Sequence, residues 1–324
     1  LGWIRANAGK RSERIIVIGA HLDHIGYGKA SSRAKKSQKG KMHPGADDNA
    51  SGISALLEIA EYLVALQKKG LLKSNYDILI AAWSGEEIGL LGSAHFTREL
   101  GLGKNKAGQS KIISYLNLDM VGRYKDKLTL HGIGSSPAWK KLIQRANIPV
   151  GLNLNLQKDS HIPTDTTSFF TKGVPILSAF TGLHADYHSP ADTPEKINFE
   201  GVADCAKLYV RLVEGVALLD NMDYVAQAPP PKSRGKLRVY LGTIPDYSQT
   251  DRKGLLLSGV SKGGPADLAG LQSEDLVIEL GGKKVETIYD YTDAISTLTA
   301  GQQSGVTIIR KGKTLQLKIT PSSR

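Results

Sequence analysis

The sequence predicts a large α/β domain followed by a small β-rich domain, on three observations. Residues 1–222 alternate between continuous apolar runs, typical of buried strands, and longer segments with apolar residues at helical spacing. Residues 236–324 contain short strand candidates and only two helical segments. Between them, residues 227–235 (QAPPPKSRG) include three consecutive prolines, which cannot continue a helix and favour an extended linker. We therefore expect a domain at 1–222, a proline-rich linker at 223–235 and a second domain at 236–324.

The first domain is expected to be a three-layer α/β sandwich with a mostly parallel central sheet. Residues 14–20 (RIIVIGA) and 76–83 (YDILIAAW) are apolar runs of the kind found in strands buried on both faces. Residues 49–69 instead repeat apolar side chains every three or four positions, as an amphipathic helix does. The predicted strands are 14–20, 76–83, 112–118 and 174–179, and the predicted helices are 49–69, 88–100, 136–147 and 199–219. Strands that alternate with helices in this way favour parallel pairing.

The second domain is expected to be small and rich in β-structure. Its strand candidates are short, and glycine-containing turns separate them. The predicted strands are 239–244, 254–260, 276–280, 306–310 and 314–319, and the predicted helices are 265–269 and 289–298.

Composition narrows the class of protein. The chain has 324 residues, 40% hydrophobic and 23% charged, so it can bury a sizeable core. Its single cysteine, Cys205, excludes an intramolecular disulfide, a paired-cysteine zinc site and an iron–sulfur cluster. No apolar run reaches the roughly 20 residues of a membrane helix, so no membrane span is expected. The formal net charge of +11 admits acidic partners without identifying one.

A basic insertion at residues 29–43 carries much of this charge. It holds six Lys or Arg and no acid, whereas residues 1–223 together hold 28 basic and 22 acidic side chains. The insertion therefore equals the whole excess of that region. It is either a solvated surface loop or a patch for an acidic partner. No aromatic side chain interleaves with its charges, so no nucleic-acid partner is expected.

Polar side chains follow the predicted strands where each one ends. In open α/β sheets, ligands bind beyond the carboxyl ends of the strands. These positions carry His21, Asp23, Asp47, Asp48, Glu86, Glu87, Asp119, His184, Asp186 and His188. So many carboxylates at one rim would repel one another without a cation. Mixed histidine and carboxylate ligands suit zinc and, less specifically, manganese, iron or cobalt.

Five segments at these positions carry a family resemblance. In chain order they read GAHLDH, PGADDNASG, SGEEIGLLGS, NLDMVG and YHSPADT. They resemble the co-catalytic dizinc aminopeptidases, a family that includes bacterial leucyl-type aminopeptidases and, more distantly, glutamate carboxypeptidases. The resemblance covers about residues 10–220, and its specificity is high because five spaced segments must coincide.

The resemblance implies two zinc ions. It makes Asp47 the carboxylate shared by both ions, with a peptide bond after it that is often cis in the family. His21 and Asp119 would complete one site, and Glu87 and His188 the other.

The remaining residues of the five segments receive other roles. Glu86 would be the general base, and Asp23 would orient the ring of His21 through its carboxylate. For Asp48, a helix N-cap or cis-peptide role is favoured over ligation. Asp165 precedes a threonine where relatives often show an Asp-His pair, a departure from the family pattern. The histidines without a place in the pattern, expected to be structural or solvated, are His24, His43, His95, His131, His161 and His184.

The implied activity is that of an aminopeptidase that acts on peptides with a free N-terminus. The open alternatives are a carboxypeptidase or other amide hydrolase on the same fold, and a non-catalytic receptor or scaffold. No HExxH segment is present. The one GxSxG match, at residues 259–263, lacks a later histidine and is no serine-hydrolase elbow.

Residues 236–324 resemble a PDZ domain of the bacterial protease-associated type. The resemblance rests on the YLGTI segment at 240–244 and on GVSKGGPADLAGLQSEDLVIELGGKKV, which begins at Gly259. It implies binding of an extended C-terminal peptide, with residues 241–244 as the carboxylate loop. The alternative is an appendage that binds nothing. PDZ-bearing relatives are commonly exported, so an extracytoplasmic location is expected, although no secretory signal is visible.

Overall fold

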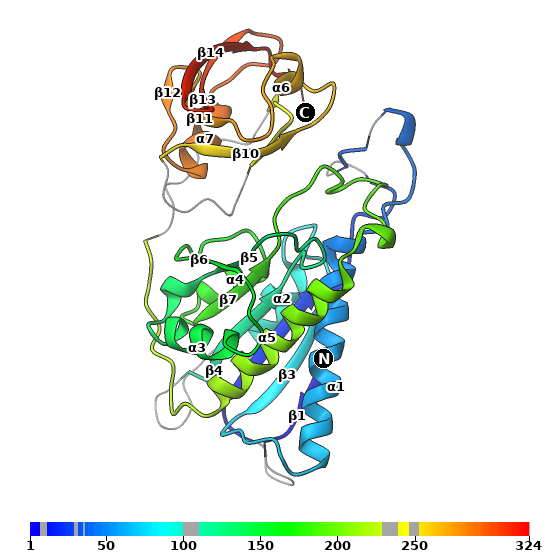
Figure 1. The fold of residues 1–324 in the computed structure, drawn as a ribbon, viewed down its shortest axis with the longest axis vertical. Coiled ribbons are helices and arrows are strands. Elements are labelled where there is room, and N and C mark those ends of the chain that lie inside the picture. Colours follow the sequence, from blue (N-terminus) through cyan, green and yellow to red (C-terminus); the bar gives the residue numbers. More distant parts are fainter. Residues whose placement is uncertain are drawn as a thin grey trace. The chain divides into compact units, whose positions relative to one another are not determined.

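The computed structural model describes residues 1–6, 12–28, 32–34, 36–99, 110–228, 239–245 and 253–323. It divides into two units: the first comprises Leu1–Thr181 and Tyr187–Ala228, and the second contains residues 239–245 and 253–323. Figure 1 shows the fold of each unit. The proline run at 229–231, predicted to be the linker, lies outside the described residues.

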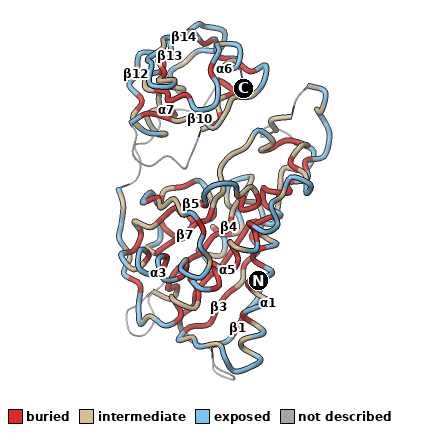
Figure 2. Tube along the Cα trace, viewed as in Figure 1, coloured by how far each residue is buried: buried red, intermediate tan, exposed pale blue. Residues whose placement is uncertain are grey.

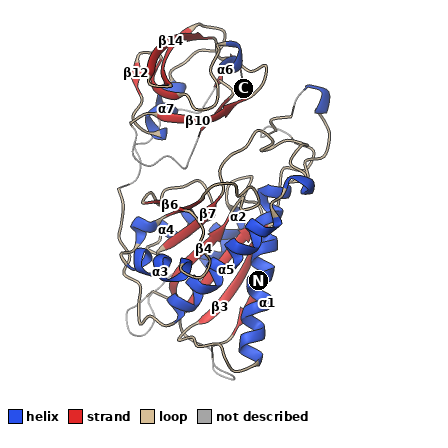
Figure 3. Ribbon diagram, viewed as in Figure 1, coloured by secondary structure: helices blue, strands red, loops and turns tan. Residues whose placement is uncertain are grey.

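A seven-stranded sheet forms the middle of the first unit (Figure 3). Its strands are β1 (Gly2–Ile4), β2 (Ile15–His21), β3 (Asp77–Trp83), β4 (Ile112–Leu118), β5 (Leu128–His131), β6 (Leu154–Gln157) and β7 (Ile176–Phe180). Their order is β1-β3-β2-β4-β7-β5-β6. The four central strands β3, β2, β4 and β7 are parallel, whereas β1 and β5 pair antiparallel with their inner neighbours. The expectation of a mostly parallel sheet is confirmed, and reversed strands lie toward its edges.

Helices cover both faces of this sheet. The helices α1 (Gly52–Lys68), α3 (Ala138–Asn147) and α5 (Phe199–Ala217) share one apolar core with Ile16 and Ile18 of β2. On the opposite face, Ile15 and Val17 of the same strand join a second core with Phe169 and Phe170 of α4 (Thr166–Phe170), and α2 (Leu91–Glu99) lies beside α4. Successive residues of a strand point to opposite faces, so a continuous apolar run fills both cores. Figure 2 shows this burial along the central strands.

The segment Ala46–Lys68 has the length and hydropathy of a weak membrane-span candidate. It includes α1, whose Leu56, Ile59 and Leu63 are buried in the core, and it begins beside Asp47 and Asp48. An amphipathic helix that covers a sheet passes the same test, because one face of it must be apolar. The structure therefore accounts for the hydropathy of this segment by burial against the sheet.

The second unit is a small antiparallel β-structure. Its strands are β8 (Val239–Tyr240), β9 (Thr243–Pro245), β10 (Leu255–Val260), β11 (Leu276–Leu280), β12 (Lys283–Lys284), β13 (Ser304–Arg310), β14 (Lys313–Ile319) and β15 (Ser322–Ser323). The main sheet runs β14-β13-β11-β10-β9, and β15 pairs with β8. The helices α6 (Pro265–Leu268) and α7 (Ile288–Ser296) contribute Ala266 and Ala294 to its core.

Several elements depart from the sequence expectation. The short strands β1, β5 and β6 and the helix α4 were not predicted, because three to five residues carry too little periodicity to stand out. The strand predicted at 239–244 is divided at Gly242, whose φ is 75°. Residues 223–228, predicted as linker, pack on the first unit: the Val225 amide donates to the Ser135 carbonyl, and the Gln227 side chain bonds Ser160 and Lys158.

Candidate metal centre

The parallel strands deliver the site residues to one edge of the sheet. His21 is the last residue of β2 and lies in register with Trp83 at the end of β3, which the Glu86–Glu87 pair follows closely. Asp119 comes directly after β4, and His188 lies in the loop after β7. Because these strands run in the same direction, their carboxyl ends meet at one rim. The predicted clustering of polar side chains therefore rests on the parallel pairing.

The tight turn Ala46–Ser51, just before α1, supplies the central carboxylate. Gly45 precedes it with φ 63°, and a Cβ there would collide with the Asp48 carbonyl, so only glycine fits. Asp48 (φ −110°, ψ 86°) leaves the helical region, and the peptide bond between Asp48 and Asn49 is cis. The Asn49 side chain ties the turn to the end of β4: its amide donates to Leu118 O at 2.9 Å, and its oxygen accepts from Met120 N at 3.1 Å.

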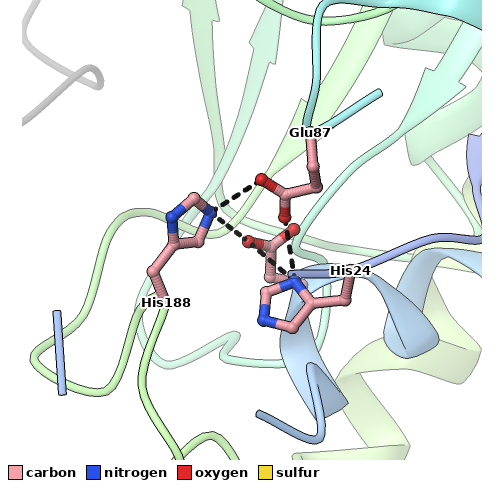
Figure 4. Close-up of side chains that lie close together, drawn as sticks. His24, Glu87 and His188 are labelled. Carbon is pink, nitrogen blue, oxygen red and sulfur yellow. Dashed lines mark hydrogen bonds and ion pairs between the residues drawn. The ribbon is translucent and has the colours of Figure 1, made fainter. Parts of the chain in front are cut away.

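Four side chains converge on one point of the rim. His188 Nε2 lies 3.1 Å from both Asp48 Oδ2 and Glu87 Oε2. His24 Nδ1 lies 2.9 Å from Glu87 Oε1 and 3.7 Å from Asp48 Oδ2. Figure 4 shows His24, Glu87 and His188 pointing toward one another. One donor atom from each of His24, Asp48, Glu87 and His188 lies within 4.8 Å of the others, a spacing that could hold a metal ion.

A second group lies beside the first and shares Asp48. His21 Nε2 is 3.2 Å from Asp48 Oδ1 and 3.5 Å from Asp119 Oδ1. His21, Asp48 and Asp119 again offer donor atoms within 4.8 Å of one another. The two oxygens of Asp48 therefore face two different donor groups, which is the arrangement of a carboxylate that bridges two cations.

The structure places Asp48, and not Asp47 as predicted, between the two donor groups. Asp47 Oδ1 accepts from the Gly122 amide at 2.6 Å and from the Ser51 hydroxyl at 3.1 Å, and Asp47 belongs to neither donor group. Both aspartates are buried, at 0% and 3% exposure, so burial does not separate them. The backbone dihedrals at Asp48 and Asn49 decide which carboxylate points to the rim, and two adjacent identical residues offer no sequence signal for that choice.

Asp192, in the last of the five segments, supports this turn and was missed in the sequence. Its Oδ2 accepts from the amides of Asp47 at 2.9 Å and Asp48 at 3.1 Å. Arg123 Nη2 donates to its other oxygen at 3.0 Å. Asp192 thus carries a balanced buried charge that positions the turn from behind. Its proximity to the turn across 144 residues of sequence is a tertiary fact.

Asp23 acts differently from the expectation. Its carboxylate accepts from the amides of Glu86 at 3.1 Å and Glu87 at 3.3 Å, so it positions the Glu86–Glu87 pair. The atom next to the His21 ring is the backbone carbonyl of Asp23, 3.0 Å from Nδ1. If Nδ1 carries the proton and donates a hydrogen bond to that carbonyl, the Nε2 lone pair of His21 faces Asp48 and Asp119. The predicted ring contact therefore comes from the carbonyl of Asp23, and the carboxylate is used elsewhere.

His24 was predicted to be structural or solvated, yet it belongs to the four-residue group. Its position three residues after His21, in the loop that follows β2, is a signal that could have found it. No slot in the family pattern pointed to it.

Glu86, the predicted general base, lies within this electrostatic environment. Burial, followed by the negative charge of Asp119, raises the pKa of the Glu86 carboxyl to about 9. Asp165, 1% exposed at the start of α4, adds to that repulsion, and burial raises its own pKa to about 6. Burial likewise raises the pKa of Asp119. Acids at this rim are therefore destabilised when they are ionised together.

The imidazoles partly offset this negative charge. Burial alone would lower the pKa of His188, but its hydrogen bonds to Asp48 and Glu87 outweigh burial and raise the pKa to about 9. The same balance, with Asp119 and Asp48 as partners, raises the pKa of His21 well above its ordinary value. Burial alone would raise the pKa of Asp48, but its hydrogen bonds to His188 and His21 outweigh burial and lower that pKa.

The donor set fits divalent transition metals. Imidazole nitrogens and carboxylate oxygens are common zinc ligands, and here they converge in two groups around one shared carboxylate. Within the described ranges, no lysine or arginine forms an ion pair with Asp48, Glu87 or Asp119, and the ion-pair partners of Asp48 are histidines alone. A buried carboxylate that has no lysine or arginine as its partner is expected to bind a metal cation.

The family assignment follows from comparison of the whole domain. Residues 4–213 match the model of peptidase family M28. The chain belongs to this family. Residues 240–320 match the PDZ domain model, so the M28 domain is followed by a PDZ domain. Both resemblances stated for the sequence are thus confirmed.

Relatives and solved structures agree with this family and fold. The chain is 30% identical over 212 residues to a probable leucine aminopeptidase of Trichophyton verrucosum, across 64% of this chain and 55% of that protein. An aminopeptidase from Aneurinibacillus sp. strain AM-1 superposes with a TM-score of 0.52 at 26% identity, covering 70% of this chain and 49% of that one. A zinc aminopeptidase from Bacillus subtilis gives 0.52 at 24% identity, over 66% and 48%. The M28 chain spans about half the length of these proteins.

Proposed function

We propose that this M28 chain is an aminopeptidase that removes N-terminal residues from peptides with two zinc ions. The observation that carries the proposal is the pair of donor groups that share Asp48, next to Glu86 on the same rim. His24, Asp48, Glu87 and His188 would hold one ion, and His21, Asp48 and Asp119 the other. The leucine aminopeptidase relative and the superposed Aneurinibacillus aminopeptidase support this choice of reaction, and the mixed histidine and carboxylate donors support the choice of zinc.

The roles of the chain's residues follow from their positions. Zinc, when bound, polarises a carbonyl and lowers the pKa of water. Glu86 takes the proton of the attacking water and returns it to the leaving amine. Glu86 must be ionised to do this, and positive charge within roughly 4–6 Å stabilises a carboxylate. Asp23 holds the amides of Glu86 and Glu87, so the base and a metal ligand keep a fixed spacing.

The acids of the rim also favour a substrate with a free amine. Asp119, Glu86 and Asp165 interact electrostatically at the site, and a protonated α-amine would relieve their repulsion. A blocked N-terminus carries no such charge. The proposed specificity is therefore that of an exopeptidase acting from the N-terminus.

The test compares the base variant with the unaltered chain. Glu86→Gln keeps the size of the side chain and removes the proton acceptor, so we expect peptide hydrolysis to fall by roughly 10²–10⁴-fold while bound zinc is retained. Metal analysis and turnover of a free-amine leucyl peptide give the two readouts. Retained turnover would contradict the role of Glu86. Cleavage of the N-acetylated peptide would favour a carboxypeptidase or another amide hydrolase, and a purified chain without zinc would favour a scaffold.

For the second unit, the proposed partner is an extended C-terminal peptide. The turn at 241–244 would receive the terminal carboxylate. Two backbone bonds support that turn: Ser261 N donates to Gly242 O at 2.7 Å, and Ala266 N to Leu241 O at 2.8 Å. An extracytoplasmic location is part of the same proposal and rests on the PDZ resemblance.

A further inference from the structure

The basic insertion is anchored at the metal rim by its described residues. The His43 amide donates to Gly26 O at 2.7 Å, and His43 Nε2 lies 2.8 Å from Ser32 Oγ. His43 is buried, and a Cβ on Gly28 (φ 67°) would collide with its ring. Ser32 is thereby held close to the start of the insertion, so the residue after it, Arg33, has a defined place.

Arg33 lies against the loop that carries a predicted metal ligand. Its amide donates to the carbonyl of His188 at 2.8 Å. Its guanidinium carbon lies 4.9 Å from the centre of the Tyr187 ring, and that ring stacks on the His188 ring with centroids 3.8 Å apart at 24°. The Arg33 guanidinium thus contacts the Tyr187 ring, and that ring contacts the imidazole of His188, a donor of the candidate metal centre. An aromatic face under a guanidinium also restrains its plane.

This guanidinium has hydrogen-bonding capacity that the described chain does not use. Arg33 Nη1 is buried without a hydrogen bond, and Arg33 forms no ion pair among the described residues. The arginines 123 and 310, by contrast, bond buried carboxylates. A buried N–H without a partner costs free energy, so a partner is expected to come from outside the chain. The planar fork of arginine matches a carboxylate, which accepts two parallel bonds.

We propose that Arg33 is a specificity residue that receives a carboxylate of the peptide substrate on the leaving side of the scissile bond. This inference rests on the proposed aminopeptidase function. One residue of extended chain spans about 3.3–3.6 Å, so a guanidinium two ring contacts from His188 lies within reach of the second or third substrate residue. The carboxylate is either an acidic side chain there or the free C-terminus of a dipeptide or tripeptide. Both present the same chemistry to Arg33.

The test separates these two sources with matched peptides. Leu-Asp-amide against Leu-Asn-amide isolates the side-chain carboxylate, and Leu-Gly against Leu-Gly-amide isolates the C-terminal one. With the zinc-loaded full chain, we expect kcat/KM to favour the acid over its amide in at least one pair. In Arg33→Gln, that preference should fall by roughly 10–100-fold, mainly through KM, because a charge-assisted bond is lost. Arg33→Lys, which keeps the charge without the fork, should fall between the two.

A control variant from the same insertion distinguishes one contact from general charge. Lys39 is exposed, and Lys39→Gln removes the same charge, so both preferences should stay as in the unaltered chain. An equal loss in Lys39→Gln and Arg33→Gln would overturn the proposal, as would an unchanged preference in both Arg33 variants. The absence of any preference for an acid in the unaltered chain would overturn it as well.

Binding without turnover keeps this outcome separate from that of the proposed function. In the Glu86→Gln background, calorimetric titration with the same four peptides gives the ratio of Kd between amide and acid. We expect Arg33→Gln to reduce that ratio as it reduces the kinetic preference. If none of the peptides is hydrolysed, the aminopeptidase proposal fails, and the Kd ratio still decides the role of Arg33. A Kd ratio that Arg33→Gln leaves unchanged overturns the inference even if hydrolysis is observed.

Discussion

The two units compensate their buried carboxylates in different ways. In the PDZ unit, Asp275 is 0% exposed and Arg310 closes on it with Nε at 2.6 Å and Nη2 at 2.7 Å. The Gln272 amide bonds the same carboxylate at 2.9 Å. In the M28 unit, Asp48 is 3% exposed and faces the imidazoles of His21 and His188 instead.

This difference separates a carboxylate paired with a guanidinium from one whose partners are imidazoles. A guanidinium is always protonated in proteins, so Arg310 offers Asp275 a permanent positive charge. An imidazole can either carry a proton or donate its lone pair to a metal. When His21 and His188 bind metal ions, those ions would replace the protonated imidazoles as the positive charges beside Asp48. The M28 unit contains both types, because Arg123 bonds Asp192 directly behind the turn that presents Asp48. The Arg123–Asp192 ion pair thus supports the turn that places Asp48 between the histidines.

The largest expected effect comes from removing the Asp48 carboxylate, which belongs to both donor groups. Asp48→Asn should reduce bound zinc and lower kcat/KM by more than the roughly 10–100-fold that loss of a residue behind a ligand costs, because both donor groups use this side chain. Metal analysis and leucyl-peptide turnover measure the two effects. The matched control is Asp47→Asn, one residue away and equally buried, which should keep its zinc. If Asp47→Asn loses zinc and Asp48→Asn keeps it, the assignment made from this structure is reversed.

Breaking the Arg310–Asp275 ion pair should destabilise the PDZ unit without changing the zinc content of the chain. Arg310→Met leaves Asp275 buried without its cation, and we expect a loss of about 2 kcal/mol, less than for a fully buried pair because Arg310 reaches solvent. Faster amide hydrogen exchange in β11 of the full chain would report it. The surface pair Lys284–Glu286 supplies the control, and Lys284→Met should change exchange much less, because solvent screens this pair. Equal effects in the two variants would contradict the distinction drawn here.

The smallest effect is expected for the residue that positions the Glu86–Glu87 pair. Asp23→Asn keeps one acceptor for the two amides and removes the charge, so kcat should fall by about 10-fold with the zinc content little changed. A change confined to KM would argue against this positioning role. Loss of zinc comparable to that in Asp48→Asn would instead make Asp23 part of the metal centre.

Much of the fold could be predicted because its central strands carry their own signal. Strands β2, β3 and β4 are mostly apolar, and their boundaries differ from the predicted ones by one residue at most. The short strands β5 and β6 have no such pattern, and only their pairing beside β7 makes them strands. Short elements gain their stability from neighbours, so their own residues say little about them.

The candidate site divides in the same way. His21, Glu87, Asp119 and His188 were predicted by the five segments, and the structure brings each of them into one of the two donor groups. Asp48, His24 and the support from Asp192 were not predicted. Asp48 depends on the direction of its side chain, and His24 depends on how the loop after β2 folds. The support from Asp192 depends on a contact across 144 residues.

By itself, the sequence determined which residue types stand at the ends of the strands, and with them the family and the chemistry of the site. It did so because apolar runs and polar rims are local patterns. Only the tertiary structure decided that Asp48 rather than Asp47 lies between the histidines, that the Asp23 carboxylate holds the Glu86–Glu87 amides, and that Arg33 lies beside Tyr187. These facts depend on backbone dihedrals and on contacts between distant segments, and hydrophobic periodicity encodes neither.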